Sequence, residues 1–506
     1  MSLAARLLVP AERLYDALSD PRRRDRTMAF VLCCYALIWT LYGTLAKGSQ
    51  SIHFDTGEMI SWSRANVLGT PKHPPLGAWL MELWFAVFPS VEWALYLFTM
   101  VSATIGLWAA WKVSQRYLDP GKCVAGLALL TLVPFYNFHA LKYNANTAPL
   151  PFWALTAWWF LVSFETRSKV AAALAGIAAA AAMQSKYWSI FLLIGLGLAV
   201  LADPRRARYF GSAAPWVTVA SGAIAFAPHV IWLYANDFPP FAFSVLHVGN
   251  AGALAAGLRY FPDIVAYIAL PIVLAAIAAR PSRAAVSDTV WPHDPARRTA
   301  LLAFALPLLL PMLAIIARIA VLPLWTIPAM TLLPVALLSS ARLVMPRVAA
   351  VRILALAIVL PIAMTLAAPV IALVIHRHDS PNDAARYQLV ADDIGKLWRS
   401  ASDRPLKIVG GNTNLANGVV FYLPDKPLAY EMMLPQWTPW INQARIDREG
   451  IAMVCRQDEA DCIGAAERIA AGKPDTKQAD VAVARRYFGI EGATGRYRIF
   501  AVPPRP

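Results

Sequence analysis

The chain has 506 residues, of which 58% are hydrophobic and only 15% are charged, with a formal net charge of +15. So much apolar surface cannot be hidden inside one water-soluble core, which excludes an ordinary soluble protein. The positive charge does not indicate nucleic-acid binding, because the basic residues lie in short loops between apolar runs, where membrane topology explains them.

Apolar runs recur along the chain at close to the roughly 20 residues that cross a bilayer. The first run, 27–46, follows a basic leader, 1–26, and lacks a small-residue cleavage site, so we expect an anchor and not a removed signal. We expect about eleven spans within a membrane domain at 27–375. They lie near 27–46, 91–113, 121–137, 147–164, 170–184, 187–202, 214–234, 261–279, 299–317, 326–341 and 350–375.

If the N-terminus is cytoplasmic, the basic loops lie on the cytoplasmic side of a bacterial inner membrane, in accord with the positive-inside rule. The same threading places a long first loop, 47–90, and the tail, 376–506, in the periplasm. Cys455 and Cys462 lie close together in that tail, where an oxidising compartment would favour a disulfide between them.

The tail alternates between strand-like and helix-like segments, which predicts a small α/β domain. We expect strands at 406–409, 451–455 and 497–502, and helices at 414–422 and 461–471. The Gly410-Gly411-Asn412 turn lacks the full dinucleotide-binding fingerprint, so an ordinary turn is favoured over an anion cradle.

The first loop holds the strongest candidates for chemistry. If 55–66 forms a short helix, Asp55 and Glu58 lie on one face, where one carboxylate could act as a base and the other could bind a cation. The pair could also ligate Mg²⁺ or Mn²⁺. Taken alone, the spacing fits an N-terminal helix cap better.

Lys72 and His73 precede a proline-started amphipathic helix at 76–88, which suits the membrane interface. With Lys142 and Lys186 in two other outer loops, these side chains could hold a lipid phosphate. Snorkelling would explain each lysine taken singly.

The loop 139–147 concentrates hydrogen-bonding side chains at the entry to a span, as sugar recognition requires, although helix capping would use such residues equally well. Its candidates are Tyr143, Asn144 and Asn146. In the expected loop 235–260 the polar candidates are Asn236, Asp237, His247 and Arg259, and their spacing does not single out a metal site.

The segments FDTGEMISWSRANVLGTPKHPPLGAWL, HALKYNANT and SKYWSIF resemble the family 39 glycosyltransferases of the GT-C membrane fold. That family includes protein mannosyltransferases and aminoarabinose transferases. Within it, the sequence of these segments is most similar to bacterial enzymes of the lipopolysaccharide galacturonosyltransferase type. The resemblance covers the membrane region, is strongest at 53–80, 139–147 and 184–190, and is vaguer in the tail.

The resemblance implies transfer of one sugar from a polyprenyl-phosphate carrier to an acceptor hydroxyl outside the membrane, on lipid A, a core sugar, another polysaccharide or a protein. Asp55 matches the family's acidic residue and is expected to be a general base or to orient the acceptor, with Glu58 assisting. Some relatives carry an adjacent Asp-Glu pair, whereas this chain has Asp-Thr-Gly-Glu, which leaves the second carboxylate's role open.

The same resemblance assigns the donor-binding residues. Lys72 and His73 match the positions before the family's Pro-Pro-Leu, and Lys186, followed by Tyr187, matches a basic position in an outer loop. The leaving phosphate needs cations or a divalent metal, and Lys72, Lys142, Lys186 and Arg259 are available. Direct displacement of the carrier phosphate predicts inversion at the anomeric carbon.

Two other functions compete with this one. A lipid-linked sugar transporter or flippase would also have many spans, but carriers usually show internal repeats and polar residues at mid-span, which are not evident in this sequence. A scaffold whose tail binds another envelope protein would use exposed aromatics such as Trp437 and Trp440.

Overall fold

The computed structural model describes residues 3–245, 253–316, 321–378 and 383–505. Its contacts divide the chain into two compact units. The first consists of Met1–Trp39, Thr99–Leu141 and Ala145–Ala363, and the second of Thr40–Phe98, Lys142–Asn144 and Met364–Pro506. The predicted first loop, 47–90, and the predicted tail, 376–506, therefore fall within the same unit.

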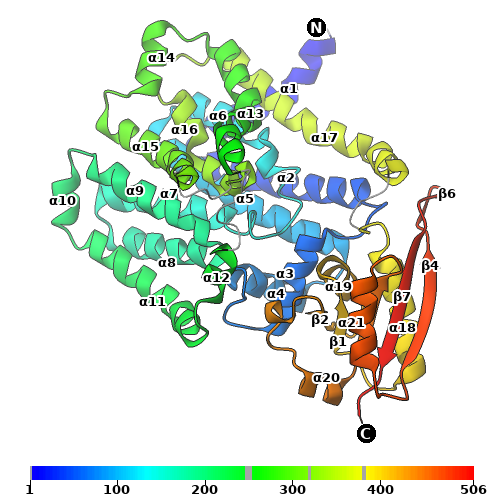
Figure 1. Cartoon of the computed structure of the whole chain (residues 1–506). Helices are drawn as coiled ribbons and strands as arrows, with labels where there is room; N and C mark the ends of the chain where they lie inside the picture. The colour runs from blue at the N-terminus through cyan, green and yellow to red at the C-terminus, as the bar shows by residue number, and fades with distance from the viewer. Residues whose placement is uncertain (1–2, 246–252, 317–320, 379–382, 506) are drawn as a thin grey trace. The chain divides into compact units, whose positions relative to one another are not determined.

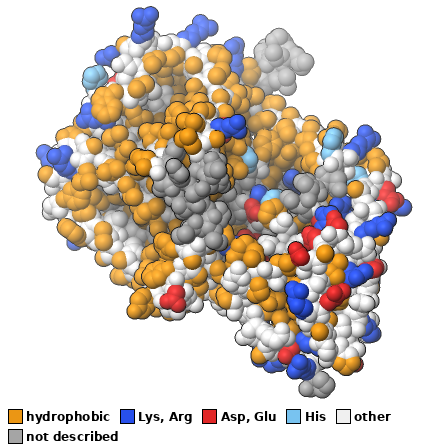
Figure 2. Space-filling view, in the orientation of Figure 1, with side chains coloured by type: hydrophobic (Ala, Val, Ile, Leu, Met, Phe, Trp, Pro, Cys, Tyr) orange, Lys and Arg blue, Asp and Glu red, His pale blue; other side chains and the backbone are white. Residues whose placement is uncertain are grey.

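Six helices among the described residues are long and apolar enough to cross a membrane. They belong to α2 (Arg24–Ala46), α5 (Glu92–Tyr117), α11 (Ala214–Ala235), α13 (Ala253–Ala279), α15 (Pro295–Leu309, continued by η3) and α17 (Arg347–His378). Hydrophobic side chains cover most of the visible face of this helical part in Figure 2. The chain is a multi-pass membrane protein, and the count of eleven spans stays a prediction.

Shorter helices fill the rest of the helical part. They are α1 (Leu3–Ser19), α6 (Pro120–Thr131), η1 (Pro134–Tyr136), α7 (Leu150–Thr166), α8 (Lys169–Ser185), η2 (Tyr187–Ser189), α9 (Ile190–Leu201), α10 (Arg206–Phe210), α12 (Pro239–Val245), α14 (Arg283–Val290), η3 (Leu310–Ile315), η4 (Pro323–Leu332) and α16 (Leu333–Leu338).

Two segments differ in structure from what the sequence predicted. The expected loop 235–260 is partly helical, because α12 lies in it and α13 begins at Ala253, in a segment rich in helix-forming alanine. The expected span 326–341 is a 3₁₀ helix, η4, followed by the short helix α16. Pro323, Pro328 and Pro334 explain this break, since proline removes a backbone donor and clashes with the preceding turn.

The tail forms an α/β domain, as predicted. Its five-stranded sheet has the order β2-β1-β3-β7-β4, with β1 parallel to β2 and β3, and β7 antiparallel to β3 and β4 (Figure 1). The strands are β1 (Ile408–Gly411), β2 (Leu428–Glu431), β3 (Ile451–Arg456), β4 (Lys477–Val483) and β7 (Gly495–Val502), and a separate hairpin pairs β5 (Arg486–Tyr487) with β6 (Ile490–Glu491).

Apolar side chains alternate along the strands and fill a core on each side of this sheet. On one side pack α18 (Tyr387–Ala401) and α19 (Thr413–Val420), and on the other α20 (Gln443–Glu449) and α21 (Ala460–Ala470). A short 3₁₀ turn, η5 (Pro435–Trp437), follows β2. The sequence did not predict α18, α20, β2, β4 or the β5–β6 hairpin.

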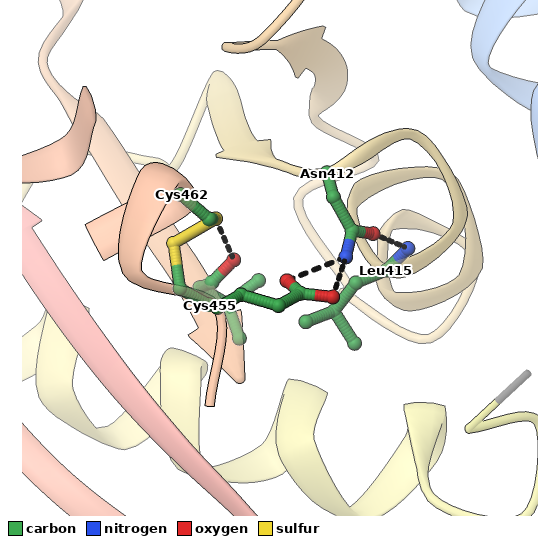
Figure 3. The surroundings of a disulfide bond; sticks show 6 residues. Asn412, Leu415, Cys455 and Cys462 are labelled. Carbon is green, nitrogen blue, oxygen red and sulfur yellow. Dashed lines mark hydrogen bonds between the residues drawn. A yellow bond between two sulfur atoms is a disulfide. The ribbon is translucent and has the colours of Figure 1, made fainter. Parts of the chain in front are cut away.

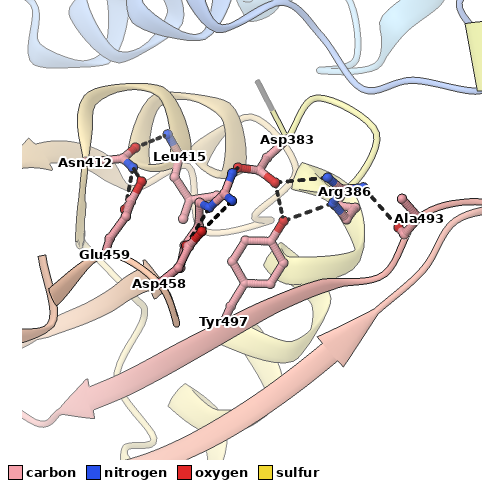
Figure 4. Close-up of polar contacts among 9 residues, drawn as sticks. Asp383, Arg386, Asn412, Leu415, Asp458, Glu459, Ala493 and Tyr497 are labelled. Carbon is pink, nitrogen blue, oxygen red and sulfur yellow. Dashed lines mark hydrogen bonds and ion pairs between the residues drawn. The ribbon is translucent and has the colours of Figure 1, made fainter. Parts of the chain in front are cut away.

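Buried polar groups fix the start of the domain to its sheet (Figure 4). The carboxylate of Asp383 accepts hydrogen bonds from Arg386 at 3.1 Å, from the Tyr497 hydroxyl at 2.8 Å and from Arg456 at 3.2 Å. Arg386 also donates to the carbonyl of Ala493 at 3.0 Å. Since each buried charge in this network has partners, it ties α18 to β3 and β7 without leaving an unpaired group.

A second polar link supports α19 (Figure 3). Asn412 is the N-cap of α19, its side-chain oxygen accepting from the Leu415 amide at 2.9 Å, and its amide donates to both carboxylate oxygens of Glu459 at 2.8 and 2.7 Å. A disulfide between Cys455 and Cys462 closes the turn that carries Glu459. The Gly410-Gly411-Asn412 segment is thus the end of a strand and a helix cap, which is the ordinary-turn interpretation.

Candidate functional site

The first loop presents its carboxylates on a short helix, α3 (Phe54–Ala65), close to the bounds that the sequence predicted. The N-cap is His53 and not Asp55: the Nδ1 atom of His53 accepts the Asp55 amide at 3.1 Å. Burial and the positive charge of Lys142 lower the pKa of His53 to about 4, so the ring is neutral at pH 7 and able to accept. The side chain of Asp55 therefore does not cap α3.

Asp55 is held ionised by its neighbours. Its Oδ2 atom lies 2.7 Å from Lys142 Nζ and accepts a hydrogen bond from the Asn144 amide at 3.1 Å. Burial raises the pKa of Asp55, but the hydrogen bond and charge of Lys142, helped by Asn144, outweigh this and keep the pKa below its usual value. The Asp55 side chain remains 30% exposed, so this carboxylate is both charged and accessible.

Glu58 faces a different cation. Its Oε1 atom lies 2.5 Å from Lys72 Nζ, and Lys72 also lies 3.9 Å from Oε1 of Glu431, at the end of β2. The lysine ammonium sits 3.7 Å from the centroid of the Trp437 ring. Burial raises the pKa of Glu58 to about 7 despite Lys72, and nearby Glu431 and Asp55 add to the increase.

Helix α3 is fastened to the tail domain in the same unit. Arg64 donates to the carbonyls of Val420 at 2.7 Å and Pro427 at 3.2 Å, and the Ser61 hydroxyl accepts the Ala429 amide at 3.3 Å. At Gly57, α3 approaches α19 so closely that a Cβ atom would overlap the backbone of Asn417. The tail domain therefore sets the position of the candidate carboxylates.

His73 and Tyr143 have structural contacts. The Thr70 hydroxyl accepts the His73 amide at 3.0 Å and donates to its carbonyl at 3.0 Å, which shapes the turn before α4 (Leu76–Val87). The His73 ring meets Trp62 edge-on at 5.8 Å. Tyr143 is fully buried against Phe98 and donates to the Gly77 carbonyl at 3.3 Å.

On α4, Leu83 and Val87 are 67% and 76% exposed, as an interfacial helix requires.

The first unit contains a second group of the predicted residues. Lys186 is buried, donates to the side-chain oxygen of Asn146 and lies over the Trp325 ring at 4.7 Å from its centroid. Tyr187 shares a 2.7 Å hydrogen bond with Nε2 of His229 and stacks on its ring. Lys186 and Asn146 thus contact each other directly, whereas the next residue, Tyr187, has His229 as its partner.

The candidates of the expected loop 235–260 lie at other positions of the fold. Arg259 lies exposed within α13. Asn236 is the C-cap of α11, and Asp237 follows it in a left-handed conformation. His247 lies outside the described residues.

A metal site is not formed by the candidate carboxylates. Among the described residues no group of three or more His, Cys, Asp or Glu side chains converges, and Asp55 and Glu58 are each ion-paired with a different lysine. A hard divalent cation favours several oxygen ligands, which this arrangement does not offer.

The sequence did not identify Glu431, Thr413 or His53. Thr413 donates to Oε2 of Glu431 at 3.0 Å and so orients a carboxylate that is only 3% exposed. The available signal was a lone glutamate in the apolar segment Leu428–Met432, since a buried charge of this kind needs partners.

Comparison with known proteins defines the fold. A family model described as dolichyl-phosphate-mannose-protein mannosyltransferase matches residues 72–232. The crystal structure of ArnT from Cupriavidus metallidurans bound to undecaprenyl phosphate matches with a TM-score of 0.62 at 13% identity, over 94% of this chain and 97% of that chain. The chain has the GT-C fold.

The apo structure of the same ArnT gives a TM-score of 0.61 at 13% identity, over 93% of this chain and 97% of that chain. No protein of curated function matches this chain in sequence. The GT-C fold and the family match, which includes the segments at 139–147 and 184–190, confirm the resemblance to the family 39-like GT-C proteins, whereas the closer likeness to galacturonosyltransferases stays a prediction. Since the first unit and the tail are both covered, the tail domain belongs to this architecture.

Proposed function

We propose that the chain transfers a single sugar from a polyprenyl-phosphate donor to a hydroxyl of an envelope glycan acceptor, such as lipopolysaccharide or lipid A. The reaction takes place on the periplasmic side of the bacterial inner membrane. The GT-C fold, the mannosyltransferase family match and the undecaprenyl phosphate held by the similar ArnT structure support this function. Basic residues in the predicted inner loops support the orientation.

The observation that carries the proposal is the state of Asp55, which is ionised, a third exposed and fixed by Lys142 and Asn144. A carboxylate in this state accepts the proton of the acceptor hydroxyl while the hydroxyl oxygen attacks the anomeric carbon of the donor sugar. The bond from that carbon to the carrier phosphate breaks, and the phosphate leaves with the bonding electrons. A single displacement of this kind inverts the anomeric centre.

Cations stabilise the charge that develops on the leaving phosphate. The proposed contacts near α3 are Lys72 of the first loop and Lys142 of the loop 139–147, which is 37% exposed beside Asp55. Asn146, Lys186, Tyr187 and Arg259 remain proposed donor contacts of the membrane part, and His73 and Tyr143 support the first-loop residues through packing.

The test is sugar transfer by membranes that contain wild-type or Asp55→Asn protein, supplied with polyprenyl-phosphate sugars and lipopolysaccharide. Loss of a general base predicts a rate lower by roughly 10²- to 10⁴-fold. Asp461→Asn, at an exposed position on α21, makes the same chemical change and should retain full activity.

Transfer that persists in correctly inserted Asp55→Asn protein would remove Asp55 from the mechanism. A retained anomeric configuration in the product would contradict single displacement. If the wild type transfers no sugar but moves the lipid-linked sugar across vesicle membranes, the chain is a transporter instead.

A further inference from the structure

Lys72 lies in a cage that is closed on three sides. Glu58 Oε1 is 2.5 Å from its ammonium, Glu431 Oε1 is 3.9 Å away, and the Trp437 ring covers it at 3.7 Å. The side chains of Lys72, Glu58 and Glu431 are only 11%, 17% and 4% exposed. A buried ammonium between two carboxylates is held firmly in one position.

The walls of the cage come from both ends of the sequence. Glu58 belongs to α3 of the first loop, whereas Glu431 and Trp437 belong to β2 and η5 of the tail domain. Thr413, the first residue of α19, donates to the far oxygen of Glu431 at 3.0 Å and leaves the near oxygen to face Lys72. The tail domain thus supplies a group that acts on a candidate donor-binding lysine.

The charges in the cage do not balance. Two carboxylates share one ammonium, and neither is well exposed to water. Burial raises the pKa of Glu431 although Lys72, Thr413 and Asn417 oppose the increase, and burial also raises the pKa of Glu58 to about 7. Any event that draws Lys72 away leaves two buried carboxylates without their cation, which is costly while both are ionised.

We propose that Glu431 is a positioning residue, which together with Glu58 holds Lys72 before the donor binds. When the donor phosphate takes over the ammonium of Lys72, one carboxylate of the Glu58–Glu431 pair takes up a proton from solvent. The proton returns to solvent when the phosphate leaves. This inference rests on the proposed function in one respect, that Lys72 binds the donor phosphate.

Asp55 does not share this behaviour, although it is also paired with a lysine. Its side chain is 30% exposed, and the Asn144 amide at 3.1 Å remains as a partner if Lys142 turns toward the phosphate. The charged groups that act on Glu58 are Lys72, Glu431 and Asp55. The groups that act on Glu431 are Lys72, Thr413 and Asn417. Proton uptake is therefore assigned to Glu58 and Glu431.

The test is calorimetric titration of the full-length protein with a polyprenyl phosphate at pH 8, in buffers of different ionisation enthalpy, which counts the protons bound. At this pH the phosphate itself, with a pKa of about 6, is already a dianion. We expect uptake of about one proton by the wild type. Uptake should fall in Glu431→Gln and disappear in the Glu58→Gln/Glu431→Gln double variant.

Glu467→Gln, an exposed change on α21, is the matched control and should bind with the wild-type proton count. As a second measurement on unaltered protein, the Kd for the phosphate should rise about tenfold per pH unit above neutrality, which is the linkage of one proton. This measurement remains decisive even if Glu431→Gln does not fold.

The outcomes separate the inference from the proposed function. Binding without proton uptake and with a pH-independent Kd overturns the inference and leaves the proposed function intact. Uptake unchanged in folded Glu431→Gln removes Glu431 from this role. A wild type that binds no polyprenyl phosphate overturns the proposed function, and this inference with it.

Discussion

Replacing Gly57 by alanine tests whether the tail domain positions the candidate carboxylates. Gly57 lies between Asp55 and Glu58 on α3, where the helix meets α19. An added Cβ would lie 2.7 Å from the carbonyl carbon of Asn417, 3.2 Å from the Gly418 nitrogen and within overlap of the Asn417 carbonyl oxygen. These neighbours are backbone atoms of a capped helix, so they cannot rotate away as a side chain would.

The expected magnitude follows from two opposing effects. Alanine improves helix propensity over glycine by about 1 kcal/mol, whereas overpacking costs about 1–3 kcal/mol. The difference is a net loss of up to about 2 kcal/mol, and we expect a separation of α3 from α19 by roughly 1 Å. A misplacement of that size can lower a reaction rate by roughly 100-fold.

The assay compares sugar transfer and thermal unfolding in detergent for wild type, Gly57→Ala and Gly464→Ala. Gly464 lies within α21, and a Cβ there meets only the flexible end of Arg468 at 3.5 Å, an ordinary contact. Gly464→Ala should therefore be neutral or more stable than the wild type, with unchanged transfer.

The two variants make the same chemical change in a helix, so the difference between them reports the contact with α19. Wild-type transfer and stability in Gly57→Ala would refute the close approach of α3 and α19. Loss of stability with full transfer would show that the contact does not position Asp55 and Glu58.

Two further predictions concern the tail disulfide and the buried glutamate. Cys455→Ser should lower the free energy of unfolding of the tail domain by about 2–3 kcal/mol, because the disulfide closes a loop with a sequence separation of 7. Denaturant titration measures this difference. The prediction is contradicted if a reductant lowers the stability of the variant as much as that of the wild type. The pKa of Glu58, about 7 against an ordinary 4.5, means that the folded state keeps a proton which the unfolded chain releases, so stability should fall as pH rises from 4.5 to 7. Glu58→Gln should flatten this dependence, and an unchanged slope in unfolding temperature against pH would contradict the assignment.

The fold was predictable where local pattern determines structure. Apolar runs of membrane length, together with basic loops, predicted the helical part, and the short helix at 55–66 and the strands at 451–455 and 497–502 were predicted close to their observed positions. Strand β2 was not predicted, and its register depends on pairing with β1. Such long-range pairing is not visible in a local pattern.

The candidate site was predictable by residue type but not by partner. Asp55, Glu58, Lys72 and Lys142 stood out because charged side chains are rare in this apolar sequence. Their spacing did not reveal that Asp55 pairs with Lys142, which lies in a distant loop, while Glu58 pairs with Lys72 of its own loop. The capping interpretation of Asp55 failed for a local reason, because His53 takes the N-cap position.

Glu431 shows why the tail could not be assigned a role from sequence. A glutamate at a strand end is ordinarily solvated, and the packing of β2 and α19 against α3 brings this one beside Lys72. If Lys72 binds the donor phosphate as proposed, its ammonium, which two buried carboxylates share, becomes available to that phosphate when a proton replaces it. Donor affinity would then depend on a residue of the tail domain, which makes that domain part of the chemistry and not only a cover for it.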